Sequence, residues 1–159
     1  MDPGKFVNHR PIAAQSHCAV LRESCMQNIL DGIKKFQRDV FPRQRELFRA
    51  LSNTQQPEVL FVTCGDSRVV PTLITQTQPG ELFLSRQVGN VVPPNGSTYG
   101  GVSATIEYAV AALKVKHLVI CGHSDCGAMK AVLHPERLSS LPNVAHWLSH
   151  CDAAKSLVD

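Results

Sequence analysis

The sequence of 159 residues has no apolar run long enough to span a membrane, and its first residues lack the continuous apolar stretch of a secretory signal. Its net charge of +3 is too small to indicate a nucleic-acid-binding protein. Cys-x-x-Cys pairs, which mark structural zinc sites and thiol redox sites, are also missing. These absences predict a cytoplasmic protein with reduced thiols that binds neither membranes nor nucleic acid.

The spacing of apolar residues predicts a single α/β domain. Hydrophobic residues make up 43% and charged residues 18% of the chain, as is usual for globular proteins. Apolar runs predict buried strands at 59–62, 81–86 and 117–121, with helical patterns between them at 71–75 and 102–113. Strands and helices in this alternation form a parallel sheet with right-handed crossovers, flanked by the helices.

The N-terminal part of the chain divides at Met26. Residues 1–25 carry little pattern and are expected to be a poorly ordered extension, so that the domain spans residues 26–159. From Met26 onward, apolar residues recur at helical spacing until Phe41-Pro42, where the proline predicts the end of the helix. Apolar residues at 47–51 then predict a second short helix before a polar break.

Three residues that suit zinc follow two of the predicted strands. Cys64 lies just past the first strand, and His123 and Cys126 follow the third. The carboxyl ends of parallel strands meet at one edge of a sheet, where loops gather functional residues. Two thiolates and an imidazole match Zn²⁺, and three protein ligands leave its fourth tetrahedral position open for catalysis. The spacing alone fits a second interpretation, two buried thiols and a loop histidine without metal.

Asp66 and Arg68 extend this pattern to Cys-x-Asp-x-Arg followed by His-x-x-Cys. Four segments lie between the two motifs: Gln78-Pro79-Gly80-Glu81-Leu82-Phe83, Arg86-Gln87-Val88-Gly89-Asn90-Val91-Val92-Pro93, Gly100-Gly101-Val102-Ser103-Ala104 and Ile106-Glu107-Tyr108-Ala109-Val110. With these segments, the sequence resembles the β-class carbonic anhydrases from about Met26 to its last residue. It is most similar to their bacterial cyanate-associated branch, and the resemblance implies the same parallel-sheet α/β fold.

The resemblance implies a zinc enzyme that reversibly hydrates CO₂ to bicarbonate and a proton. Cys64, His123 and Cys126 would hold Zn²⁺, and zinc-bound hydroxide would attack the carbon of CO₂. Asp66 would accept a hydrogen bond from the zinc-bound water while Arg68 grips its carboxylate. If that pair opened, Asp66 would become the fourth zinc ligand in a resting state. In the cyanate-associated branch, the enzyme would supply bicarbonate to cyanate breakdown.

The resemblance also implies a substrate pocket at a subunit interface. Gln55 aligns with a residue that orients the substrate, and Phe83, Val88 and Tyr108 align with residues that narrow the CO₂ cleft. The backbone amide of Gly127 would donate to a substrate oxygen. The family assembles as homodimers or larger homo-oligomers, with Gln55, Phe83 and Tyr108 partly contributed across the interface and the N-terminal helix lying across a neighbouring subunit.

Other residues of metal-binding type match no ligand position of the family. Cys121 ends an apolar strand and is predicted to be a core residue, and His117 is predicted to begin that strand at the surface. The remaining histidines of this region are His134, His146 and His150. Gln87 stands where the family usually has asparagine, which puts the hydrogen bonds of the local loop in question.

The end of the chain departs most from the family. Helices are predicted from Cys126 to Leu133 and from Val144 onward, and the sequence then stops at Asp159, whereas similar chains continue with a further helix and strand. The domain is therefore expected to lack its C-terminal part, with an incomplete sheet and an exposed apolar edge. Three alternatives to an active carbonic anhydrase stay open: an inactive zinc-binding remnant, an interaction module, and a carbon disulfide or carbonyl sulfide hydrolase.

Overall fold

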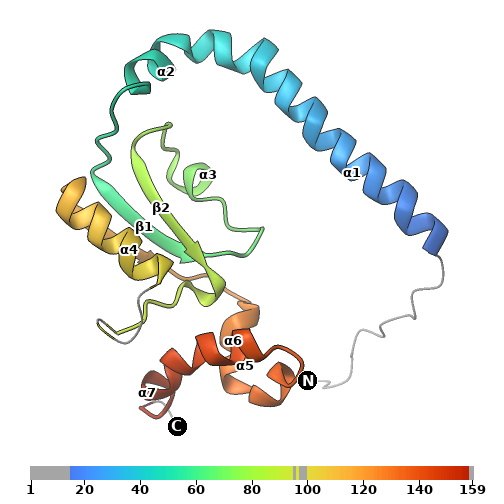
Figure 1. The fold of residues 1–159 in the computed structure, drawn as a ribbon, viewed down its shortest axis with the longest axis vertical. Helices are drawn as coiled ribbons and strands as arrows, with labels where there is room; N and C mark the ends of the chain where they lie inside the picture. Colours follow the sequence, from blue (N-terminus) through green and yellow to red (C-terminus); the bar gives the residue numbers. More distant parts are fainter. Residues whose placement is uncertain (1–14, 95, 97–99, 158–159) are drawn as a thin grey trace, which may run out of the picture. The chain divides into compact units, whose positions relative to one another are not determined.

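The computed structural model describes residues 15–94, 96 and 100–157, and the chain divides into two units, Met1–Ser52 and Asn53–Asp159 (Figure 1). The described part of the first unit is helical. Its elements are α1 (Gln15–Lys35), a π-helical turn (Phe36–Val40), a 3₁₀ turn (Phe41–Gln44) and α2 (Arg45–Leu51).

Helix α1 begins eleven residues before the predicted start at Met26. The structure continues the helix over residues 15–25 of the predicted extension, whereas residues 1–14 lie outside the described residues, and the division of the chain at Met26 stays a prediction. The predicted stop at Phe41-Pro42 is confirmed, because the π-helical turn ends at Val40 and a separate 3₁₀ turn begins at Phe41, with Pro42 in its first turn, where the missing N–H needs no partner. The second short helix, α2, is confirmed.

Phenylalanine rings connect the turns of this unit. The ring of Phe48 lies 5.9 Å from that of Phe36 and 5.4 Å from that of Phe41, measured between centroids. Such ring pairs stabilise the bend between α1 and α2 beyond their burial. Along α1 the apolar residues Met26, Ile29 and Ile33 remain at least half exposed, so the chain leaves an apolar helix face open.

A three-stranded parallel sheet forms the centre of the second unit. Its strands are β1 (Val59–Cys64), β2 (Leu82–Gln87) and β3 (His117–Cys121), in the order β2-β1-β3. Cys64 lies opposite Gln87 of β2, and Thr63 lies opposite Cys121 of β3. The predicted parallel sheet and its three strands are confirmed, although Cys64 is the last residue of β1 and does not lie beyond it.

Helices cover the central strand and gather beyond its carboxyl end (Figure 1). Helix α4 (Gly101–Glu107) and the π-helical turn after it pack on β1, where Leu60, Val62 and Ala109 are fully buried. A second apolar cluster joins the helices that follow β3, which are α5 (Gly127–Leu133), α6 (Pro142–Leu148) and α7 (Asp152–Lys155). The short helix α3 (Pro71–Thr75) follows β1 as predicted.

Strand β3 forms an open edge of the described sheet. Among the described strands it pairs with β1 alone. Its apolar side chains Leu118, Val119 and Ile120 are 47%, 38% and 56% exposed, whereas the residues of β1 are mostly buried. This matches the expected exposed apolar edge, a surface that invites further strand pairing. No helix in the described part of the chain is both long and apolar enough to cross a bilayer.

Replacing Leu60 with alanine tests the core. Leu60 is fully buried in the cluster on β1, so we expect Leu60→Ala to lower the free energy of unfolding by about 2–5 kcal/mol. Urea unfolding followed by circular dichroism measures this. Leu157→Ala is the matched control because Leu157 is 87% exposed, and its effect should stay within about 0.5 kcal/mol. Equal effects of the two changes would contradict this description of the core.

Candidate metal centre

The carboxyl ends of β1 and β3 bring three metal-binding side chains together. Cys64 closes β1, and His123 and Cys126 lie in the segment between β3 and α5. The hydroxyl of Thr63 donates to the carbonyl of Cys121 over 2.9 Å, which ties the two strand ends to each other. The donor atoms of Cys64, His123 and Cys126 all lie within 4.8 Å of one another. The structure thus assembles the three predicted ligands.

The geometry of this cluster fits a metal ion. The two sulfurs are 4.0 Å apart, far longer than a disulfide of about 2.05 Å. A tetrahedral ion with metal–sulfur bonds of about 2.3 Å would place its two sulfurs roughly 3.8 Å apart. His123 Nδ1 donates to the carbonyl of Ser124 over 2.9 Å, and its Nε2 is buried with no hydrogen-bond partner among the described residues. A metal between the sulfurs would satisfy that nitrogen.

The electrostatics of the cluster favour thiolate. Burial raises the pKa of Cys64, but the neighbouring His123 imidazole and the backbone N–H groups of Asp66 and Gly89 lower it more, to about 7. The adjacent Cys64 sulfur in turn raises the pKa of His123, against the effect of burial. Metal ligation requires the thiolate form of cysteine, so Cys64 offers that form near neutral pH.

Asp66 and Arg68 form a two-point ion pair beside the cluster. Arg68 Nε donates to Asp66 Oδ1 over 2.9 Å, and Nη2 donates to Oδ2 over 2.8 Å. The backbone N–H of Arg68 also donates to Oδ1 over 2.9 Å. These bonds hold the pKa of Asp66 well below its usual range and raise that of Arg68. Asp66 Oδ2 lies 3.9 Å from His123 Nε2, so an ionised carboxylate borders the metal centre.

Strand β2 fixes the backbone of this loop. Arg86 donates from Nε to the carbonyl of Cys64 over 3.2 Å and from Nη2 to that of Asp66 over 2.7 Å. The N–H of Gly65 donates to the carbonyl of Gln87 over 2.9 Å. Sequence reasoning did not assign Arg86 this function. The available signal was its place in the Arg86-to-Pro93 segment, which carries the resemblance.

Gly89 is a second residue that the sequence analysis did not single out. Its φ of +70° is strained for other residues, and a Cβ at this position would lie 2.9 Å from Met129 Cε and 3.0 Å from Ala128 Cβ. Only glycine therefore lets this turn pack against α5 while its N–H donates to Cys64. Nearby, Gln87 Nε2 donates to the carbonyl of Val91 over 3.0 Å. The glutamine therefore makes a hydrogen bond within its own loop, although the family usually has asparagine here.

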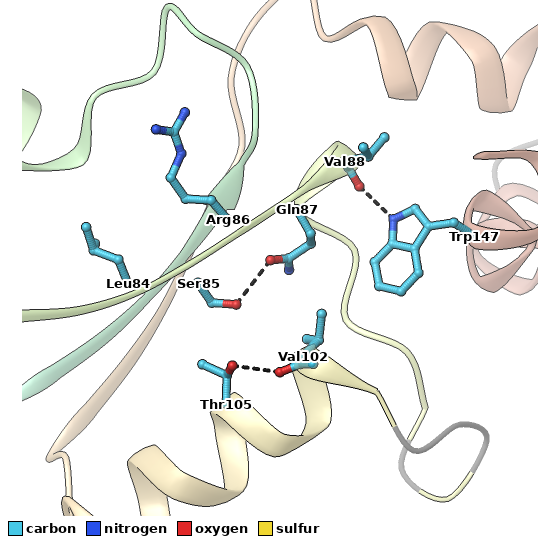
Figure 2. Close-up of a pocket in the computed structure, with 9 residues that line it drawn as sticks. Leu84, Ser85, Arg86, Gln87, Val88, Val102, Thr105 and Trp147 are labelled. Carbon is cyan, nitrogen blue, oxygen red and sulfur yellow. Dashed lines mark hydrogen bonds between the residues drawn. The ribbon is translucent and has the colours of Figure 1, made fainter. Parts of the chain in front are cut away.

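A pocket of about 560 Å³ opens next to the metal loop, between β2, α4 and α6 (Figure 2). Figure 2 shows Ser85 and Gln87 on the side of β2 that faces Thr105, with Trp147 beyond them. The Trp147 indole donates to the carbonyl of Val88 over 2.8 Å. Val88 is the one predicted pocket residue in this lining, and it immediately precedes Gly89, so the pocket adjoins the metal centre.

The other predicted pocket residues lie elsewhere in the second unit. Phe83 and Tyr108 pack together with ring centroids 5.8 Å apart, on the cluster that covers β1. Phe83 lies opposite Leu60, four residues before Cys64, which places it roughly 13 Å along the sheet from the metal edge. Gln55 is exposed before β1, and Gly127 begins α5, where first-turn N–H groups lack helical acceptors.

The residues predicted not to bind metal lie outside the cluster. Cys121 is only partly buried, so it is less of a core residue than predicted. His117 is exposed at the start of β3, as expected. His134 Nδ1 lies 3.6 Å from a carboxylate oxygen of Glu136, and His150 packs edge-on against Trp147.

Three converging side chains that could hold a metal ion lie next to an Asp-Arg ion pair at one edge of a parallel sheet, which places the chain among α/β proteins with a candidate metal centre. The profile of the carbonic anhydrase family matches residues 59–159. The chain is 53% identical over 132 residues to a carbonic anhydrase of Pseudomonas aeruginosa, covering 83% of this chain and 60% of that protein. It is 52% identical over 130 residues to carbonic anhydrase 1 of Escherichia coli O157:H7, with coverages of 82% and 59%.

Solved structures agree with the sequence relatives. The β-carbonic anhydrase CcaA superposes with a TM-score of 0.81 at 46% identity, covering 84% of this chain and 65% of that one. The Coccomyxa β-carbonic anhydrase solved with acetazolamide gives 0.69 at 32% identity, with coverages of 81% and 56%. The chain belongs to the β-carbonic anhydrase family. It spans between about half and three fifths of the length of the curated relatives that it matches.

Metal analysis tests the assembled ligands. We expect Cys64→Ser to weaken binding of a divalent metal by more than about 100-fold, because losing a ligand costs more than losing an outer-shell partner. Dialysis against chelator-buffered zinc followed by elemental analysis measures the affinity. Cys121→Ser is the matched control, since its thiol lies outside the cluster, and it should bind metal like the parent protein. Equal metal affinity in both variants would show that the cluster is not the site.

Proposed function

We propose that the protein is a zinc-dependent carbonic anhydrase that interconverts CO₂ with bicarbonate and a proton. One observation carries the proposal: two sulfurs and an unpartnered buried imidazole nitrogen converge within 4.8 Å, with the Asp66 carboxylate 3.9 Å from that nitrogen. Zinc bound by Cys64, His123 and Cys126 supplies the acidity that makes a water nucleophilic near neutral pH. The protein residues around the zinc position orient that water and prevent other orientations of it.

Asp66 is suited to orient a water because of its remaining acceptor capacity. A carboxylate offers about four lone-pair positions, and an ionised one donates no hydrogen bond. Oδ1 accepts from both Nε and the backbone N–H of Arg68, while Oδ2 accepts from Nη2. The free position on Oδ2 lies on the oxygen nearer His123, so Asp66 would accept a hydrogen bond from a metal-bound water and leave a lone pair of the water oxygen free for CO₂.

The ion pair with Arg68 also separates two states of Asp66. While the pair is closed, both carboxylate oxygens are held by Arg68. If it opened, Oδ2 would be free to approach the metal position and to act as a fourth ligand. The closed pair seen here supports the water-orienting function of Asp66, and the open pair would correspond to the resting state.

The remaining site residues support a homo-oligomeric enzyme. Val88 would supply an apolar wall, as a nonpolar gas requires, and the N–H of Gly127, the first residue of α5, would donate to a substrate oxygen; the position of Val88 in the pocket lining and of Gly127 at the helix start support this. Phe83, Tyr108 and Gln55 lie away from their own chain's metal edge, so we propose that a second copy contributes them. Two β-carbonic anhydrases of Sordaria macrospora, 34% identical at a TM-score of 0.62, are tetrameric.

A cytoplasmic location belongs to the proposal because the cluster needs reduced thiols, and Cys64 and Cys126 are both free. The link to cyanate breakdown stays a prediction from the resemblance. The alternative of an inactive zinc-binding protein draws support from the open apolar edge of β3.

Stopped-flow CO₂ hydration by the zinc-loaded protein is the direct test. We expect a rate well above that of Cys64→Ser, loss of the excess rate on chelation, and recovery when zinc is returned. The oligomeric state is measured by light scattering on the same sample. Full zinc occupancy with a rate equal to the Cys64→Ser blank would contradict the proposal and support the inactive alternative.

Asp66→Asn tests the water-orienting carboxylate separately from the metal. An amide in this position offers donors as well as acceptors and no longer pairs with Arg68 as an ion. We expect kcat to fall by about 100-fold or more with zinc content unchanged. Asp152→Asn, an exposed aspartate in α7, should retain full activity. Full activity of the Asp66→Asn protein would show that the carboxylate has no part in the mechanism.

A further inference from the structure

We propose that Asp125 is a positioning residue that holds Arg68 against Asp66, and that Lys130 anchors Asp125 for this purpose. The inference rests on the proposed function and deepens it. Asp125 lies between the metal ligands His123 and Cys126, and no role was assigned to it from the sequence. Its contacts make the ion pair beside the metal centre a chain of four charged residues: Asp66, Arg68, Asp125 and Lys130.

The Arg68 guanidinium is occupied on two edges. One edge, Nε and Nη2, faces the carboxylate of Asp66 at 2.9 and 2.8 Å. The other edge faces Asp125: Nη2 donates to its backbone carbonyl over 3.2 Å, and Nη1 lies 3.5 Å from its carboxylate Oδ2. A planar fork held on both edges cannot rotate about its last bonds without breaking contacts to two residues.

The backbone of Asp125 is held in an uncommon conformation. Its φ is +57°, in the left-handed region that non-glycine residues seldom adopt and that aspartate and asparagine tolerate best. Strained residues of this kind persist where the surrounding structure requires them, and they gather at functional sites. Here the segment carries two metal ligands, and its carbonyl accepts from Arg68.

Lys130 holds the second oxygen of the Asp125 carboxylate. Its Nζ pairs with Oδ1, which leaves Oδ2 facing Arg68. Lys130 lies in α5, and its backbone N–H donates to the carbonyl of Cys126 over 3.0 Å. The same helix turn therefore places a metal ligand and the cation that orients Asp125.

These side chains are too exposed to contribute much to folding. Arg68, Asp125 and Lys130 are 59%, 61% and 51% exposed, and ion pairs this exposed contribute little to stability. By holding Arg68 in place, the same interactions raise the fraction of molecules in which the Asp66–Arg68 ion pair is closed. We therefore expect an effect on turnover of about two- to fivefold with stability nearly unchanged.

The test compares zinc-loaded parent protein with Asp125→Asn, which keeps a side chain suited to positive φ and removes the charge. Two quantities are measured: CO₂ hydration at saturating and limiting substrate, and hydrogen exchange at the Arg68 Nε–H by ¹⁵N NMR. We expect kcat to fall about two- to fivefold, KM to change little, and Nε–H exchange to accelerate by a similar factor. Zinc content and unfolding midpoint should match those of the parent.

Variants of Lys130 separate positioning from simple charge loss. Lys130→Met should reproduce part of the Asp125→Asn effect. Lys130→Arg should behave like the parent protein because it keeps the positive charge. Glu58→Gln, which breaks another exposed pair in the same unit, should change neither kcat nor the exchange at Arg68. Parent-like kcat and exchange in Asp125→Asn would overturn the inference. Because exchange at Arg68 does not require turnover, a parent protein without activity would refute the proposed function and leave this test intact.

Discussion

Parallel pairing of β1 with β3 is the contact on which the metal centre depends. Thr63 and Cys121 lie opposite each other across this pair, and the residues that follow them carry all three ligands. Pairing the two strands closes the loop of chain between Thr63 and Cys121, and closing such a long loop costs only modestly more entropy than closing a short one. The burial of Leu60 and Val62 on β1 offsets this cost. The register of β1 and β3 thus sets where the two ligand-bearing segments begin, and the segment between β3 and α5 completes the approach of the three donor atoms.

Around that edge, neighbouring elements restrain the charged groups in layers. Arg86 and Gln87 of β2 hold the loop backbone after Cys64, and Asp125 and Asp66 hold Arg68 from two sides. A carboxylate next to a buried imidazole must be both ionised and immobile to act as an acceptor, and these contacts supply both conditions. The site combines a buried Cys-His-Cys cluster with an exposed rim of ion pairs.

The sequence predicted the strands, the parallel sheet and the three ligands because each rests on local pattern: apolar runs, and polar residues placed directly after them. It failed where distant contacts decide. The sequence also missed the start of α1 at Gln15, because residues 15–25 are compatible with a helix but have no strong periodicity. Arg86 donates to the backbone carbonyls of Cys64 and Asp66, and the carbonyl of Asp125 accepts from Arg68, so the types of the side chains alone do not assign these contacts.

By itself, the sequence determined the chemistry available. Cysteine, histidine, aspartate and arginine at these spacings supply the donors for a thiolate-imidazole metal site and an ionised carboxylate beside it. The tertiary structure alone decided which groups meet. It brought Cys64 Sγ to within 4.0 Å of Cys126 Sγ, and it placed Phe83 far along the sheet from the edge at which these cysteines lie. The physical reason is that spacing along a chain fixes the faces and ends of elements, whereas distances between side chains follow from strand register and packing.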